Sequence, residues 1–154
     1  MTGTRSDHTE EYCEIGGAKV QLLKGGDGPP LLFLHGAMGG GMWLPFLGRL
    51  ARRFTVYAPA HPGFGRSEDP PWLDCVDDMV HYYLDFLDWL GRKKVHVVGL
   101  SLGGWIAAEL AALCSHRLDR LVLVDSAGLR GDGVKVPDLF AMTPEEVVAH
   151  IFAK

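Results

Sequence analysis

The sequence predicts an α/β fold, in which a mostly parallel sheet carries helices on both faces. Short apolar runs of strand type recur along the chain, and Leu31–Leu34 is fully apolar, as in strands buried on both faces. Segments with helical spacing of apolar residues alternate with these runs. The length of 154 residues, with 47% apolar and 22% charged residues, is ordinary for one globular domain.

The chain is expected to open with a hairpin, whose turn is Gly16-Gly17, before the strand–helix alternation begins. The strands are predicted at Glu11–Ile15, Lys19–Lys24, Leu31–Leu34, Phe54–Ala58, Val95–Leu100 and Arg120–Asp125. The helices are predicted at Met42–Arg53, Asp74–Leu90 and Leu102–Cys114, and a further helix begins at Thr143.

The second predicted helix has the most regular pattern. Its apolar residues recur every three or four positions, its first turn is acidic, and Gly91 ends it. The apolar stretch Val95–Cys114 is about long enough to cross a membrane, but its polar and glycine residues favour a buried strand, a sharp turn and a packed helix.

Charge and cysteine content exclude several classes of function. The formal charge of −4, from 15 basic and 19 acidic residues, predicts no nucleic-acid partner. Three widely spaced cysteines without a C-x-x-C pair argue against a disulfide framework or a zinc site, and we expect no metal. The polar segment 1–17 has no apolar core of a signal peptide, so we expect a cytoplasmic location and no membrane partner.

The main chemical signal is Gly99-Leu100-Ser101-Leu102-Gly103, a G-x-S-x-G pattern between a predicted buried strand and a predicted helix. In this context the pattern is typical of a nucleophile elbow, a tight and strained turn that exposes a serine hydroxyl. Glycines two residues to either side avoid a collision across the turn, which gives Gly99 and Gly103 supporting roles. Ser101 is therefore the predicted catalytic nucleophile.

A second motif, His35-Gly36-Ala37, directly follows the strand Leu31–Leu34. With this motif the sequence resembles the α/β-hydrolase fold superfamily, in particular its cap-bearing serine hydrolases. The resemblance implies an oxyanion hole formed by the backbone N–H groups of Ala37 and Leu102. It also implies supporting roles for His35, which would hold the turn by hydrogen bonding, and for Gly36.

The third motif, Ala58 to Ser67, resembles the loop that follows the fourth strand in this superfamily. Ala60 stands where an acidic residue is frequent, and His61 is interpreted as structural. The resemblance covers Val20 to Leu129, and the three motifs occur in the order and spacing of the superfamily.

A serine nucleophile needs a base and an orienting acid, which follow it in the chain order of this fold. The resemblance places the acid after a seventh strand and the histidine after an eighth. After Ser101 the chain has only His116 and His150, and Asp125 is interpreted as a cap of its loop rather than as the acid. We therefore expect the N-terminal portion of a hydrolase, truncated after the sixth strand and inactive as an isolated chain, with core residues at 1–129 and the start of a cap or lid at 130–154.

The expected function is that of a serine hydrolase acting on a small molecule that contains an ester, a lactone or a C–C bond next to a carbonyl, with no cofactor. A serine here argues against epoxide hydrolases and haloalkane dehalogenases, which use a carboxylate nucleophile. The alternatives are a non-catalytic fragment or scaffold, and a cofactor-free enzyme similar to haloperoxidases. The strand Arg120–Asp125 lacks its outer neighbour, so self-association through this edge is also expected.

Overall fold

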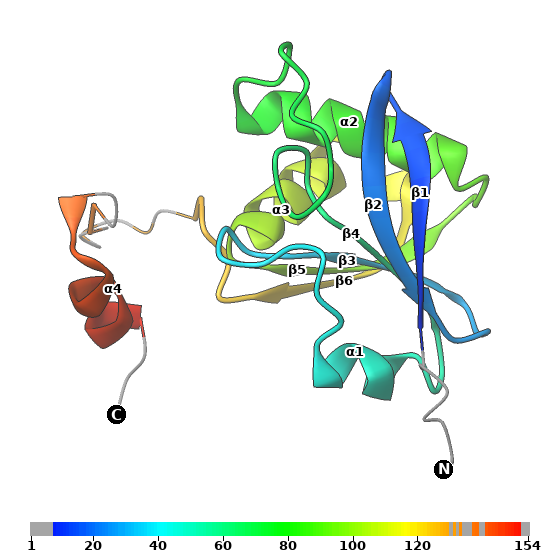
Figure 1. The fold of residues 1–154 in the computed structure, drawn as a ribbon, viewed down its shortest axis with the longest axis horizontal. Coiled ribbons are helices and arrows are strands. Elements are labelled where there is room, and N and C mark those ends of the chain that lie inside the picture. Colours follow the sequence, from blue (N-terminus) through cyan, green and yellow to red (C-terminus); the bar gives the residue numbers. More distant parts are fainter. Residues whose placement is uncertain (1–7, 130, 132, 134–136, 139–140, 152–154) are drawn as a thin grey trace.

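The computed structural model describes residues 8–129, 131, 133, 137–138 and 141–151 (Figure 1). One sheet of six strands runs in the order β1-β2-β4-β3-β5-β6. The strands are β1 (Thr9–Ile15), β2 (Ala18–Gly25), β3 (Pro30–Leu34), β4 (Thr55–Pro59), β5 (Val95–Leu100) and β6 (Leu118–Val124). The helices are α1 (Pro45–Leu50), α2 (Val76–Trp89), α3 (Leu102–Cys114), the short 3₁₀ helix η1 (Ser115–Arg117) and α4 (Pro144–Ile151).

The sheet is mostly parallel, and the predicted fold class is confirmed. β3 pairs in parallel with β4 and β5, and β5 pairs in parallel with β6, whereas β1 and β2 form an antiparallel hairpin. The hairpin turns at Gly16 and Gly17, whose φ angles of 58° and 80° favour glycine. β2 joins the parallel part of the sheet by antiparallel pairing with β4.

The connections on the two sides of β3 run in opposite directions across the sheet. The connection through α1 leads to β4 on one side of β3, and the connection through α2 returns to β5 on the other side. Because parallel crossovers are right-handed, this reversal places α1 on one face of the sheet and both α2 and α3 on the other (Figure 1). Open α/β sheets bind ligands at such a reversal, beside the carboxyl ends of the strands.

Alternation along the strands divides the apolar side chains between the two faces. In β3, Leu32 and Leu34 pack beneath α2 and α3, while Leu31 and Phe33 pack beneath α1. All four of these side chains are buried. Both faces of the central strands are thus covered, which explains why β3 is a continuous apolar run.

Two predicted helices are shorter in the structure. The helix predicted over Met42–Arg53 is α1, which begins at Pro45 because proline suits the first helical position. The helix predicted from Asp74 begins at Val76, where the Asp78 carboxylate accepts the backbone N–H groups of Asp74 and Cys75.

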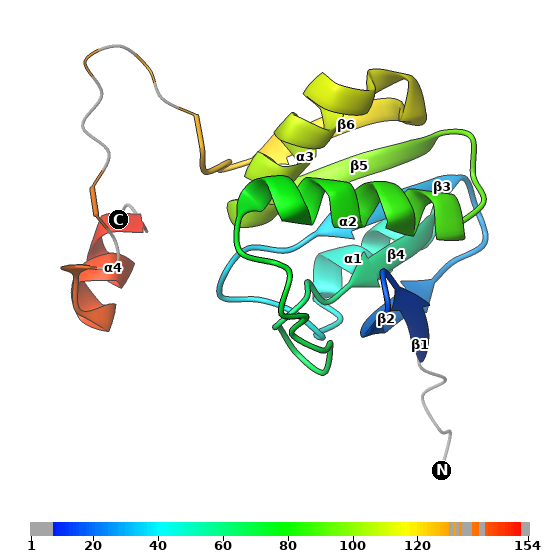
Figure 2. The ribbon, with the colours of Figure 1, turned by 90° about the horizontal axis from the view of Figure 1, so that it is seen from above.

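The stretch 95–114 forms a strand, a turn and a helix, as predicted. No helix in the described ranges has the length and apolar character of a membrane span. α4 lies apart from the sheet in both views (Figures 1 and 2).

The two edges of the sheet differ in chemistry. β1 carries three glutamates, Glu10, Glu11 and Glu14, and charge of this kind protects an edge strand from pairing with another chain. β6 ends in a run of four apolar residues. These residues are 38% (Leu121), 50% (Val122), 38% (Leu123) and 39% (Val124) exposed. Backbone groups on the outer side of β6 have no strand partner among the described residues.

We predict that the chain self-associates through β6. Val122→Lys is expected to shift sedimentation toward monomer, because a lysine on an edge strand opposes pairing with a second copy. The matched control is Val148→Lys, which changes an equally exposed valine on α4 (51% exposed) and should leave the association unchanged. A parent chain that sediments as a single monomer over a wide concentration range would contradict the prediction.

Candidate active site

The site lies at the carboxyl end of the parallel strands. His35 follows β3, His61 lies two residues beyond β4, and Ser101 follows β5. Since β4, β3 and β5 are neighbours in the sheet, these three residues meet at one edge, at the reversal of the connections.

Ser101 forms a strained turn between β5 and α3. Its φ of 52° and ψ of −113° lie in a region that residues other than glycine rarely adopt, and such strain is frequent at functional sites. The turn leaves no room for side chains at the flanking glycines. A Cβ at Gly99 would lie 2.3 Å from the carbonyl oxygen of Gly103, and a Cβ at Gly103 would lie 2.1 Å from that of Leu34.

The backbone of Ser101 is held by the end of β6. Its N–H donates to the carbonyl of Val124 (2.9 Å), and its carbonyl accepts the N–H groups of Ala127 (3.0 Å) and Trp105 (3.1 Å). Gly104 lets α3 approach this segment closely, since a Cβ there would lie 2.8 Å from the Ser126 hydroxyl oxygen. The sequence patterns did not indicate this support, because it depends on contacts between residues distant in the chain.

The loop after β3 reaches the same turn. A Cβ at Gly36 would lie only 3.2 Å from the Cβ of Ser101, so Gly36 lies directly beside the serine. The Ala37 N–H, next along this loop, has no backbone acceptor in the described part of the chain, and neither has the Leu102 N–H at the start of α3. The structure therefore brings the loop and the serine together and leaves these two donors available.

Two buried histidines join the loops that follow β3 and β4, with ring centroids 3.7 Å apart. The backbone N–H of His61 donates to His35 Nε2 (2.9 Å), which leaves the proton of His35 on Nδ1, where it bonds the Gly36 carbonyl (2.8 Å). His61 Nε2–H donates to the His35 carbonyl (2.8 Å), and His61 Nδ1 accepts the Tyr83 hydroxyl (2.5 Å). Both rings are therefore neutral, each with one proton and two hydrogen bonds.

Tyr83 of α2 belongs to the site, although its position in the sequence follows only the spacing of the apolar residues of this helix. Its side chain is fully buried, and burial raises the pKa of its hydroxyl well above the usual range. A buried tyrosine hydroxyl usually has a hydrogen-bond partner, and this rule is the signal that could have pointed to a contact. The partner itself is contributed by another loop and cannot be read from the pattern.

Burial also keeps both histidines uncharged. It lowers the pKa of His35, and together with the neighbouring His35 ring it lowers the pKa of His61 to about 3. Neither ring has a free nitrogen to take a proton from Ser101, because all four ring nitrogens are engaged elsewhere.

No hydrogen bond joins the Ser101 hydroxyl to a histidine whose side chain the structure describes. The other histidines with described side chains contact other groups. His8 stacks on Trp43, His81 bonds the Asp77 carbonyl, His96 lies beside Asp119 and His116 beside Cys114. Asp125, at the end of β6, has a φ of 44° and is exposed.

Among the residues that the structure describes, no three His, Cys, Asp or Glu side chains come together as they would around a metal ion.

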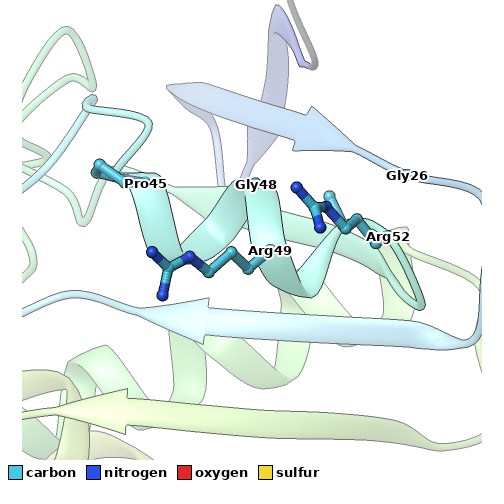
Figure 3. Close-up of a pocket in the computed structure, with 6 residues that line it drawn as sticks. Gly26, Pro45, Gly48, Arg49 and Arg52 are labelled. Carbon is cyan, nitrogen blue, oxygen red and sulfur yellow. The ribbon is translucent and has the colours of Figure 1, made fainter.

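A separate cavity of about 470 Å³ lies between α1 and the start of the β2–β3 loop (Figure 3). Arg49 projects from α1, Arg52 lies just after the helix on the side of Gly26, and Pro45, Gly48 and Ala51 complete the lining. None of these residues belongs to the serine turn or to the His35–Ala37 loop, so the cavity contributes nothing to the candidate active site.

A parallel sheet with a strained serine between its central strand and a helix, beside a glycine loop, defines the class of α/β-hydrolase fold proteins. The family model described as alpha/beta hydrolase fold matches residues 29–149, and the chain belongs to this family.

Its relatives include hydrolases with different substrates. The chain is 31% identical over 131 residues to the 2-hydroxy-6-oxo-6-(2'-aminophenyl)hexa-2,4-dienoic acid hydrolase of Metapseudomonas resinovorans, covering 82% of this chain and 45% of the relative. It is 39% identical over 110 residues to a pimeloyl-[acyl-carrier protein] methyl ester esterase of Nitrosomonas europaea, covering 71% and 42%. The chain thus spans less than half the length of these curated relatives.

Among solved structures, the 2-hydroxy-6-oxo-6-phenylhexa-2,4-dienoate hydrolase from Rhodococcus sp. strain RHA1 superposes with a TM-score of 0.71 at 31% identity. The match covers 81% of this chain and 48% of that protein. The match shows that the two proteins share the same fold over the covered part of this chain.

We predict that Gly103→Ala lowers the free energy of unfolding by about 2–3 kcal/mol, because its Cβ would collide with the Leu34 carbonyl. Gly17→Ala is the control. Unlike Gly103, Gly17 has a positive φ, but nothing lies within 4 Å of a new Cβ there, so the strain of the backbone alone should cost about 1 kcal/mol. Chemical denaturation of both variants measures the difference, and equal losses would show that the turn can widen.

We also predict that acidification destabilises the chain. Between pH 6.5 and about 3 the unfolded His61 binds a proton that the folded His61 does not, so stability falls as the pH falls, by about 1.4 kcal/mol per pH unit. His35 acts in the same direction. Denaturation at pH 7 and pH 4.5 should show a smaller pH dependence in His61→Gln than in the parent. Leu87→Ala, a core change without a titrating group, should keep the parent's dependence, and an undiminished dependence in His61→Gln would refute the assignment.

Proposed function

We propose that this chain carries the nucleophile and oxyanion hole of a serine hydrolase. The strained backbone of Ser101, held between β5 and α3, is the observation that supports this most strongly. A strained serine at the carboxyl end of a parallel strand is costly to fold and has a direct chemical use, which is to present its hydroxyl above the sheet.

In the proposed reaction the Ser101 oxygen attacks a carbonyl carbon of the substrate while a base takes its proton. The base and the acid that orients it are supplied from outside the described side chains. The N–H groups of Ala37 and Leu102 stabilise the negative charge that develops on the carbonyl oxygen, and one such donor is typically worth about 3 kcal/mol. The C–O or C–C bond to the leaving group then breaks with protonation of that group, and water hydrolyses the resulting acyl-serine.

The substrate class that we propose is a small molecule with an ester, a lactone or a C–C bond next to a carbonyl. Relatives named as a dienoic acid hydrolase and as a methyl ester esterase support this range of substrates.

The proposed location is the cytoplasm, which suits the three free cysteines Cys13, Cys75 and Cys114.

A fluorophosphonate probe tests the nucleophile in a complete version of the protein, in which the base and the acid are present. We predict that it modifies Ser101 in preference to every other serine, forming an O–P bond with loss of fluoride and of the hydroxyl proton to the base, because the proposed oxyanion donors lie beside this oxygen. Peptide mass spectrometry identifies the site. Ser101→Ala should abolish the modification and leave the circular dichroism spectrum unchanged. Modification that persists in Ser101→Ala, or that falls mainly on another serine, would refute the proposal.

A further inference from the structure

We propose that His35 is a positioning residue, fixed by His61 and Tyr83, that orients both N–H donors of the oxyanion hole. The inference rests on the proposed function, which assigns those donors to Ala37 and Leu102. His61 and Tyr83 act through His35 and touch neither substrate nor Ser101.

The first step concerns the peptide bond between Gly36 and Ala37. Its carbonyl oxygen accepts two hydrogen bonds, from His35 Nδ1–H (2.8 Å) and from the Gly39 N–H (2.9 Å). In a planar trans peptide the N–H points opposite to the carbonyl. Fixing the Gly36 oxygen therefore fixes the direction of the Ala37 N–H, away from the His35 ring.

The second step concerns the proton on His35. A neutral imidazole carries its proton on one nitrogen, and the hydrogen bond made by the other nitrogen decides which. The His61 backbone N–H donates to Nε2, so the proton must be on Nδ1, where the Gly36 carbonyl needs it. The opposite tautomer would set two N–H groups against each other at Nε2 and leave Nδ1 without a proton beside the Gly36 oxygen.

The third step concerns the second donor. The carbonyl of His35 accepts both His61 Nε2–H (2.8 Å) and the N–H of Gly103 (3.0 Å). Gly103 follows Leu102 in the first turn of α3, so this carbonyl holds the helix end that carries the other donor. His35 thus acts on one donor through its ring and on the other through its backbone.

Tyr83 completes the arrangement from α2. Its hydroxyl donates to His61 Nδ1, which requires the proton of His61 to lie on Nε2, facing the His35 carbonyl. The packing of α2 against the sheet is thereby connected to the oxyanion loop through a chain of directed hydrogen bonds. All three side chains are buried, so water does not compete for these bonds.

The adjacent tyrosines of α2 provide a matched test. Tyr82 and Tyr83 are both buried, but the Tyr82 hydroxyl has no hydrogen-bond partner in the described structure, whereas Tyr83 donates to His61. Tyr83→Phe and Tyr82→Phe each remove one buried hydroxyl, and only the first removes a bond of the proposed arrangement.

The first readout is the NMR spectrum of the ¹⁵N-labelled full chain. The parent is expected to show His35 with its proton on Nδ1 and His61 with its proton on Nε2, and the His61 ring should not titrate between pH 5.5 and 8. Tyr83→Phe should release the His61 tautomer and shift the Ala37 amide signal, while Tyr82→Phe should leave both unchanged. A proton on His35 Nε2 in the parent, or identical spectra of these groups in the two variants, would overturn the proposal.

The second readout is the rate of fluorophosphonate modification at Ser101 in a complete version of the protein, with the base and the acid present, measured at a temperature where every variant is folded. Loss of one oxyanion donor lowers rates about 10²–10³-fold, so its misorientation in His35→Ala is expected to lower the rate at least about tenfold. His35→Asn, which retains an N–H near the position of Nδ1, should recover most of that loss.

The two readouts separate the possible failures. Equal modification rates in the parent and His35→Ala would overturn the positioning role while leaving Ser101 as the nucleophile. If the parent is not modified at Ser101 at all, the proposed function fails, and the tautomers together with the Ala37 signal still decide whether His35 orients the loop.

Discussion

The carbonyl oxygen of His35 is the point on which the arrangement of the site depends. It lies at the end of β3 and accepts the N–H of Gly103 from α3 and the ring N–H of His61 from the loop after β4. Three segments that are far apart in sequence are thus tied to one atom. The contact requires α3 to approach β3 so closely that residue 103 has no space for a side chain. The glycine of the motif follows from this contact.

The chemistry of the two histidines follows from their burial. A histidine near a serine nucleophile invites interpretation as a base, but His35 and His61 have every ring nitrogen engaged and pKa values lowered by burial. A neutral imidazole with a fixed tautomer is a donor at one end and an acceptor at the other. In this protein that property connects backbone groups of different loops, which a residue with a single polar group could not do.

The sequence was sufficient to predict the order of the elements and the positions of the loops. Gly16-Gly17, the apolar run of β3 and the G-x-S-x-G pattern are local signals, and each corresponds to the structure. The start of α1 at Pro45 instead of Met42 depends on how the preceding loop leaves the sheet, which no local periodicity records.

The connections around the site were beyond the reach of sequence patterns. Tyr83 follows the same helical spacing as its apolar neighbours in α2, and only the packed fold places its hydroxyl beside His61. The bonds of Ser101 to Val124 and Ala127 likewise link residues more than 20 positions apart. Patterns of residue type identify the participants that have a local signature, whereas hydrogen bonds between loops depend on the three-dimensional arrangement.

The position of β6 has a dynamic consequence for the serine. The strained backbone of Ser101 is secured by bonds to Val124 and Ala127, at and just beyond the end of β6, which is the outermost strand of the described sheet. Edge segments with exposed apolar residues open at a lower free energy than the interior of a sheet. Fraying of this edge therefore releases the strain at Ser101 before the core unfolds, and hydrogen exchange at the Ser101 amide reports the local opening rather than global unfolding. Any molecule that pairs with β6 slows this exchange, and by linkage it increases the fraction of time that the serine spends in its strained conformation.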